Sequence, residues 1–511
     1  MPLKINIKCA ICCTHFLISF KVLFNNLIYI CFLNFRMSLK RFAKDTAIYG
    51  VATILPRIVS VLLTRLFTGE MDTSEFSVAT DFWVYAAFFN VILTYGMETS
   101  FFRFFTKHNK DEKVVNTSFT IILLTSITFL IVVLLFRVPI SAFLGIKVIY
   151  FTILTWVTIL DTIVVVPFAF LRVTNRPIRF AFIKIANIFI YLIIVLLGFK
   201  IVENSNTFQW ISQLSDNKVI YIFIANLVAS GITLIMFVKL FSKIRFSIDK
   251  KLLNEMLIYG YPIMIAGLAY VINENLDKLL LKRMLSADIM GSYAATYKVG
   301  TFMSLYITAF RLGAEPFFFS HSEQKDAKEK YATILLWFTI VGAVFLLFII
   351  ANLDLIYRFF IRQEEYFKTL AIVPIILVAN LFLGLYHNLS VWYKLTDKTR
   401  YGMYFSIFGA IITIVLNLVF IPIYGFITSA WVTLLAYGCM AIISYFYGRK
   451  YYSVPYNIRK ISIYLLTSII LSFVIFYFSY DKLLINNGVF AIFLVFIYIS
   501  ERKSIIGFVK R

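Results

Sequence analysis

Charged side chains lie inside apolar runs, and the densest group falls in "YVINENLDKLLLKR" (270–283). Glu274 and Lys278 are four residues apart there, and Asp277 is adjacent to Lys278. Residues four apart share one face of a helix, so an acid and a base at this spacing can neutralise each other. A carboxylate inside a membrane helix can also take up protons. Three interpretations stay open for the acids: an ion pair with Lys278 or Lys298, ion coupling, and exposure where the run leaves the membrane.

Arg57 lies in the middle of the apolar run 46–67, directly after Pro56. The proline lacks a backbone N–H and is expected to kink a helix at this point. A charge at the centre of a bilayer costs roughly 2.5–3.5 kcal/mol, so such a residue usually faces the protein interior or water. A guanidinium fork fits a phosphate or carboxylate group, which makes Arg57 a candidate anion contact. The alternative is an ion pair with a carboxylate such as Asp81.

Lys298 is the second candidate anion contact, because it lies two helical turns inside the run 290–312. Its neighbour Tyr297 offers an aromatic ring that can stack on a sugar. An ion pair between Lys298 and Asp277 is the alternative. Asn273 is suited to hydrogen-bonding a sugar, and equally suited to holding two helices together.

Arg311 and Glu315 are four residues apart at the end of the same run. Their spacing favours a local ion pair, so we interpret the pair as structural or as part of a gate, together with the helix-kinking Pro56.

Motifs for catalysis or for metal binding are missing from the sequence. There is no Gly-x-x-x-x-Gly-Lys-Ser/Thr loop for nucleotide phosphates. The chain has four His, and the cluster Cys9, Cys12 and Cys13 has no matching downstream ligands. We therefore predict no catalytic residue, no metal site and no cofactor.

The composition is that of an integral membrane protein. Of 511 residues, 61% are hydrophobic and 15% are charged, and apolar runs of about 20 residues, enough to cross a bilayer, recur along the chain. The formal net charge is +23, but the cations lie in short loops between apolar runs. This pattern indicates a membrane and argues against a nucleic-acid partner.

The predicted fold is an all-α membrane protein of about fourteen transmembrane helices, in two six-helix lobes plus two C-terminal helices. The predicted parts are a first lobe (37–240), an amphipathic segment (241–256), a second lobe (257–447), and two last helices with a tail (448–511). We predict Met37 as the natural start of the protein, because "MSLKRFAKDTAIYG" has the pattern of a cytoplasmic start followed by a membrane helix, which leaves residues 1–36 as an N-terminal extension outside it. The alternative for the extension is an additional membrane or interfacial segment.

Two observations support this division. "AIYGVATILP" (47–56) resembles "LIYGYPIMIAG" (257–267), which indicates that the two lobes are repeats in the same direction. Between them, residues 240–257 alternate apolar and basic side chains, which favours an interfacial helix over a plain basic loop. Alternate loops carry roughly three times as many Lys and Arg as the others, which predicts that both termini are cytoplasmic.

The order and spacing of several segments resemble the polysaccharide (Wzx-like) flippases of the multidrug/oligosaccharidyl-lipid/polysaccharide exporter superfamily. The matching segments are "KDTAIYG…RLFTGEMDTSEFSVATDF", "LRVTNRPIRFA", "IYGYPIMIAGLAYVINENLDKLLLKRML…GSYAATYKVG" and "AFRLGAEPFFFSHSEQKDAKEKYA". They fall within residues 38–480, and residues 1–36 have no counterpart.

The resemblance implies a V-shaped pair of six-helix lobes around a central cavity in the cytoplasmic membrane. It also implies that the protein moves an undecaprenyl-pyrophosphate-linked oligosaccharide by alternating access. It implies lipid-linked oligosaccharide, membrane lipids and polysaccharide polymerase machinery as partners. Within the superfamily, the alternatives are a lipid II flippase and a drug/cation antiporter. A drug antiporter is expected to have an acidic cavity, whereas the charges here are mainly basic. A membrane polysaccharide polymerase or glycosyltransferase is the alternative from another class, and the short outer loops argue against it.

Overall fold

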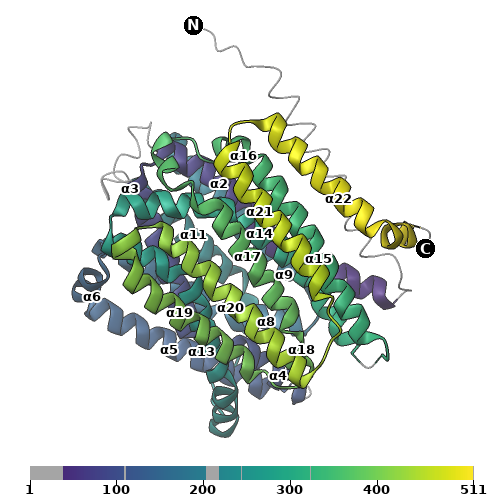
Figure 1. The fold of residues 1–511 in the computed structure, drawn as a ribbon. Helices are drawn as coiled ribbons and strands as arrows, with labels where there is room; N and C mark the ends of the chain where they lie inside the picture. The colour runs from purple at the N-terminus through teal and green to yellow at the C-terminus, as the bar shows by residue number, and fades with distance from the viewer. Residues whose placement is uncertain (1–37, 109–110, 203–217, 243, 323, 510–511) are drawn as a thin grey trace.

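The computed structural model describes residues 38–108, 111–202, 218–242, 244–322 and 324–509, so the predicted extension 1–36 lies outside the described residues. Long helices run side by side through the molecule, and no strand occurs in the described ranges (Figure 1). A helix pairs all of its backbone groups internally, as a segment surrounded by lipid must. The predicted all-α membrane architecture is confirmed.

The first group of helices packs mainly on itself, through contacts of α9 with α2 and α11 and of α7 with α5 and α11. Its elements are α2 (Ser38–Glu70), α3 (Thr73–Thr94), α4 (Met97–Lys107), α5 (Glu112–Leu135), α6 (Arg137–Leu144), α7 (Val148–Ile163), α8 (Val165–Val173), α9 (Pro177–Leu197), the π-helix η1 (Gly198–Val202), α11 (Val219–Met236) and α12 (Val238–Phe241).

The second group packs around α17, which contacts α14 and α20, and α19, which contacts α13 and α20. Its elements are α13 (Lys250–Met284), α14 (Ala287–Ser320), α15 (Ala327–Ala351), α16 (Leu353–Phe360), the 3-10 helix η3 (Glu364–Thr369), α17 (Ile372–Leu389), α18 (Val391–Leu395), α19 (Arg400–Tyr424) and α20 (Ile427–Tyr451). The last two helices, α21 (Ile458–Phe478) and α22 (Leu483–Val509), pack on α15 along one flank of the bundle (Figure 1). We call the two groups the first and second lobes.

Thirteen helices of the described chain are long and apolar enough to cross a membrane. The predicted span 290–312 lies in α14, which is not among these thirteen although it has 34 residues. α14 packs between α3 and α2 of the first lobe and α17 of the second. A helix covered by protein on these sides can carry more polar residues than one that faces lipid.

Capping side chains fix where several helices begin. Asp72 and Glu75 form a capping box at the start of α3, in which the Asp72 Oδ1 accepts from the Glu75 N–H at 2.7 Å. Ser286 caps α14 in the same manner by accepting from the Ile289 N–H at 3.2 Å. The start of α3 contacts the start of α14, where the Thr73 hydroxyl donates to Asp288 at 2.9 Å. The junctions α2–α3 and α13–α14 therefore lie at the same end of the bundle, which we call the Glu70 end.

The predicted interfacial helix between the lobes does not form. Residues 244–249 are non-helical, and α13 begins at Lys250 and continues without interruption to Met284. Side chains of α5 satisfy this non-helical backbone: Asn116 Oδ1 accepts from the Arg245 N–H at 3.0 Å, and Thr117 Oγ1 accepts from the Asp249 N–H at 3.1 Å. Asp249 then caps α13, so the basic residues before it form a connecting segment packed on the first lobe.

Candidate functional site

The predicted site residues are carried mainly by the three helices at the boundary between the lobes. Pro56 and Arg57 lie within α2 of the first lobe, and α2 packs on α14 of the second lobe. α13 contacts α3 and α4 of the first lobe as well as α19 and α14 of its own. The contacts between side chains on the facing surfaces of α2, α13 and α14 therefore change when one lobe moves against the other.

Arg57 reaches across this boundary to an uncharged partner. Its Nη1 donates to Thr308 Oγ1 of α14 at 2.6 Å, and Thr308 donates in turn to its own helix. Arg57 also interacts electrostatically with Glu274 and Tyr270 of α13. The ion pair with Asp81, the alternative from the sequence, does not form, because Asp81 pairs with Lys282.

Asp277 and Lys278 form a buried ion pair on α13. The exposed fraction is 1% for Asp277 and 6% for Lys278, and Lys278 Nζ lies 3.1 Å from Asp277 Oδ1. Tyr293 donates to the other carboxylate oxygen at 2.9 Å. Lys278 Nζ also donates to the backbone carbonyl of Glu274 at 2.5 Å and lies 4.1 Å from the ring centre of Tyr297. Asp277 therefore pairs with Lys278 and not with Lys298, the other partner that the sequence suggested.

Glu274 is the acid in this cluster that makes no direct salt bridge among the described residues. Its carboxylate accepts a short hydrogen bond from the Tyr437 hydroxyl of α20. Tyr270, one helical turn earlier, has an exposed fraction of 47% and interacts electrostatically with Arg57 and Arg311. Glu274 therefore lies between the buried pair and the more open surface around Arg57.

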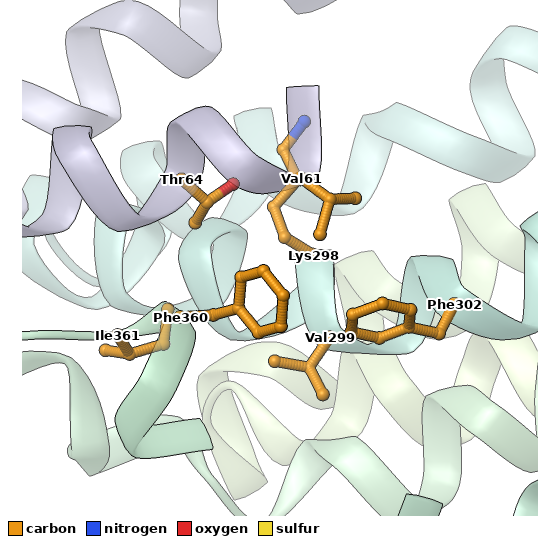
Figure 2. Close-up of a pocket in the computed structure, with 7 residues that line it drawn as sticks. All are labelled: Val61, Thr64, Lys298, Val299, Phe302, Phe360 and Ile361. Carbon is orange, nitrogen blue, oxygen red and sulfur yellow. The ribbon is translucent and has the colours of Figure 1, made fainter. Parts of the chain in front are cut away.

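Lys298 also lacks a carboxylate within salt-bridge distance in the described chain. Its Nζ lies 5.1 Å from the ring centre of Trp83 on α3, a favourable cation–π contact. It borders an apolar pocket that has no room for a water molecule. Figure 2 shows the amine of Lys298 directed past Val61 of α2, away from the rings of Phe302 and Phe360.

Asn273 and Tyr297 have contacts that favour a packing role. Asn273 Oδ1 accepts from Thr413 Oγ1 of α19 at 2.9 Å, and its exposed fraction is 3%. Its amide therefore joins α13 to α19, the second of the two roles predicted for it. Tyr297 is buried, with its ring over the amine of Lys278. Its binding of a sugar stays a prediction.

Arg311 and Glu315 pair locally on α14, at 3.2 Å. Glu315 also accepts from Lys394 of α18 at 2.7 Å, and Arg311 Nη1 lies 3.5 Å from His387 Nε2 of α17. These contacts tie α14 to its own lobe, in agreement with the structural interpretation of the pair. Its part in a gate stays a prediction.

Several contacts join the lobes at the Glu70 end. Asp81 of α3 pairs with Lys282 of α13, and Thr73 donates to Asp288 at 2.9 Å. Tyr366 of η3 donates to the backbone carbonyls of Met71 and Asp72 at 2.9 and 2.8 Å. Burial raises the pKa of the Tyr366 hydroxyl, which keeps it a donor. At this end the lobes are closed against each other.

Four residues that interact with charged side chains of this region were not identified from the sequence: Tyr270, Tyr437, Trp83 and Lys282. Tyr270 had a usable signal, because it is one helical turn before Glu274 and therefore shares its face. The other three gave no such signal, since each meets its partner across a helix boundary. These three contacts depend on which helices pack against each other, and the sequence of one helix does not reveal that.

The chemistry available here is anion binding and proton exchange. We call Arg57, Tyr270, Glu274, Lys278 and Lys298 the interlobe site. Lys278 is neutralised by the neighbouring Asp277. Among the described residues, the direct side-chain contacts of Arg57 and Lys298 are with uncharged groups. No group of three or more His, Cys, Asp or Glu within the described ranges is arranged to hold a metal ion.

This fold, with charged groups between two lobes, is that of a multi-pass membrane protein. The model of the family described as "Polysaccharide biosynthesis protein" matches residues 42–320, more than half of the chain. The chain therefore belongs to the polysaccharide biosynthesis protein family. The MatE family model matches residues 262–419.

Solved structures of several membrane transporters share the fold at low sequence identity. A lipid II flippase MurJ in an inward closed conformation is 17% identical with a TM-score of 0.65, and the match covers 89% of this chain and 99% of that one. An inward-facing multidrug resistance MATE transporter is 12% identical with a TM-score of 0.61, covering 85% and 100%. A transporter from Pyrococcus furiosus with a binding pocket of reverse polarity is 15% identical with a TM-score of 0.57, covering 80% and 95%. No curated protein sequence matches the chain.

Proposed function

We propose that this protein is a flippase that moves an undecaprenyl-pyrophosphate-linked oligosaccharide across the cytoplasmic membrane for surface polysaccharide biosynthesis. Membership of the polysaccharide biosynthesis protein family supports this cargo. In the proposed arrangement both termini are cytoplasmic, the glycan and pyrophosphate pass between the lobes, and the lipid tail stays in the bilayer. Polysaccharide polymerase machinery is the proposed downstream partner.

The observation that carries the proposal is the bonding of Arg57. Its guanidinium lies at the boundary between the lobes and donates to a hydroxyl. No acid of the described chain lies within salt-bridge distance of it, so its positive charge is not cancelled by direct contact there. A pyrophosphate can displace Thr308 and accept two parallel hydrogen bonds from the fork. Lys298 is the second proposed anion contact, and Glu274 is the proposed coupling acid, because Asp277 is already bonded twice.

Substitution of Arg57 tests this proposal. We expect R57A to reduce flipping of the lipid-linked glycan by about tenfold, the loss of one charged hydrogen bond, and R57K to be intermediate because lysine lacks the fork. Transport is measured as surface polysaccharide and as lipid-linked glycan retained on the inner leaflet. T308V is the matched control, since it removes the partner of Arg57 and keeps the charge. Normal surface polysaccharide in cells with R57A would contradict the proposal.

Three further assays separate the alternatives. A lipid II flippase is expected to sustain the growth of cells depleted of their own lipid II flippase. A drug/cation antiporter is expected to change resistance to cationic drugs. A polymerase is expected to extend glycan chains as purified protein. A positive result in any of these assays, together with normal surface polysaccharide after deletion of the gene, would replace the proposed cargo.

A further inference from the structure

A cavity of about 300 Å³ lies beside α2, on the side facing α9. Four aliphatic side chains of α2 line it together with Leu192 and Leu196 of α9. The exposed fractions of Leu62 and Leu196 are 52% and 37%, so the cavity opens to the surroundings of the helices. In a membrane, the medium next to α2 and α9 is lipid, since both satisfy the criteria for membrane spans.

Two arginines complete the lining of this cavity at the Glu70 end. Arg65 comes from α2, and Arg362 comes from the segment after α16. Arg65 Nη1 donates to the backbone carbonyl of Phe359, and its guanidinium lies 4.6 Å from the ring centre of that residue. The side chain of Arg362 runs over Gly69, where an added Cβ would lie 2.7 Å from Arg362 Cδ.

Neither arginine has a carboxylate partner within salt-bridge distance among the described residues. The nearby Glu70 lies 3.8 Å from Lys218. An arginine has five N–H donors, and Arg65 uses one in the contact above. Two guanidinium groups with free donors at the mouth of an apolar cavity are complementary to a phosphate group attached to a hydrocarbon chain.

We propose that this cavity binds an anionic phospholipid of the surrounding bilayer, with its phosphate between Arg65 and Arg362 and one acyl chain along α2 and α9. The ligand comes from the bilayer because the cavity opens outward, away from the interlobe site. The two arginines belong to different lobes, so a phosphate bound to both ties the lobes together at the Glu70 end. The lipid therefore stabilises the closed arrangement, whatever cargo the protein carries.

The test is lipid binding to the purified full chain in detergent, measured by native mass spectrometry. Phosphatidylglycerol is compared with phosphatidylcholine of the same acyl chains. We expect the anionic lipid to be retained, and R65A and R362A each to weaken its binding by about tenfold. L196W, which fills the apolar part without changing a charge, is expected to weaken the binding of both lipids. R137A removes an exposed arginine at the start of α6 and is the matched control.

Equal retention of the two lipids by the unmodified protein would overturn the proposal, and so would unchanged phosphatidylglycerol binding in R65A/R362A. A competition arm uses undecaprenyl phosphate, which has the same phosphate chemistry. Displacement of phosphatidylglycerol at equimolar concentration would assign the cavity to the carrier lipid instead. Size-exclusion profiles check that each variant is folded. R362A is expected to disturb folding least, because the side chain of Arg362 is exposed.

Discussion

At the scale of single residues, the charges on α13 are bonded to one another and to the tyrosines around them. Asp277 accepts from Lys278 and from Tyr293, so both oxygens of its carboxylate are satisfied. Burying an ion pair is costly unless its remaining hydrogen-bonding groups also find partners. Lys278 meets this condition with the Glu274 carbonyl and the Tyr297 ring. The pair is therefore a permanent part of the core.

Removing one member of this pair is expected to cost more than removing both. D277A leaves the Lys278 ammonium buried without its carboxylate, and we expect a loss of about 3 kcal/mol in the free energy of unfolding. D277A/K278M removes the charge as well and is expected to lose less. The measurement is thermal unfolding of the purified protein in detergent.

E274Q is the control for this comparison, because it removes a charge outside the buried pair and is expected to change stability little. If D277A/K278M were as unstable as D277A or less stable, the pair would not be a self-contained unit.

The sequence correctly predicted where this cluster of charges lies on α13, but it predicted only some of the bonds between its members. The four-residue spacing indicated a side-chain bond between Glu274 and Lys278, whereas the amine bonds the backbone carbonyl of Glu274 and the carboxylate of Asp277. The reason is tertiary: Tyr437 of α20 takes the Glu274 carboxylate, and Tyr297 of α14 attracts the amine. Helical spacing places residues on a face, and the neighbouring helices then select their rotamers.

At the scale of elements, apolar run length was sufficient to locate the membrane helices, because each span must satisfy its own backbone. Helix ends depended on partners that run length does not reveal. The start of α13 at Lys250 follows from the side chains of Asn116 and Thr117, far away in the sequence, which hold the segment before it in a non-helical form. Amphipathic alternation alone predicted a helix there.

The backbones of α3 and α14 approach each other closely at the Glu70 end. A Cβ built on Gly291 would lie 1.7 Å from the Thr73 carbonyl oxygen, so only glycine permits this contact. G291A must push the lobes apart there, with an expected cost of about 1–3 kcal/mol. In a background without other cysteines, the buried Ser77 of α3 reports this opening, because S77C should react with thiol reagents faster in G291A.

G313A is the matched control on the same helix, because nothing lies within 4 Å of a Cβ built on Gly313. It is expected to leave the reactivity of S77C unchanged. Equal reactivity of S77C in the two glycine variants would mean that the α3–α14 contact does not hold this end closed.

At the scale of the whole molecule, the two lobes are joined by polar contacts that can be broken without unfolding either lobe. Asp81–Lys282, Thr73–Asp288 and the Tyr366 hydroxyl bonds all cross the boundary at the Glu70 end. Apolar packing also crosses this boundary, as in the edge-to-face pair of Phe76 on α3 with Tyr366 on η3. If the lobes move as rigid bodies about the interlobe site, these contacts at the Glu70 end must separate together.

Cross-linking the lobes should therefore stop transport. T73C/D288C replaces a hydrogen-bonded pair on opposite lobes, whose side-chain oxygens lie 2.9 Å apart. In a background without other cysteines, we expect oxidation or a short thiol cross-linker to abolish surface delivery of the glycan, and reduction to restore it. N187C/T233C is the matched control, because this pair is hydrogen-bonded at the same distance, 2.9 Å, between α9 and α11 of one lobe. Transport that continued with the T73C/D288C link intact would show that the Glu70 end need not open, and the alternating-access mechanism would then be wrong for this protein.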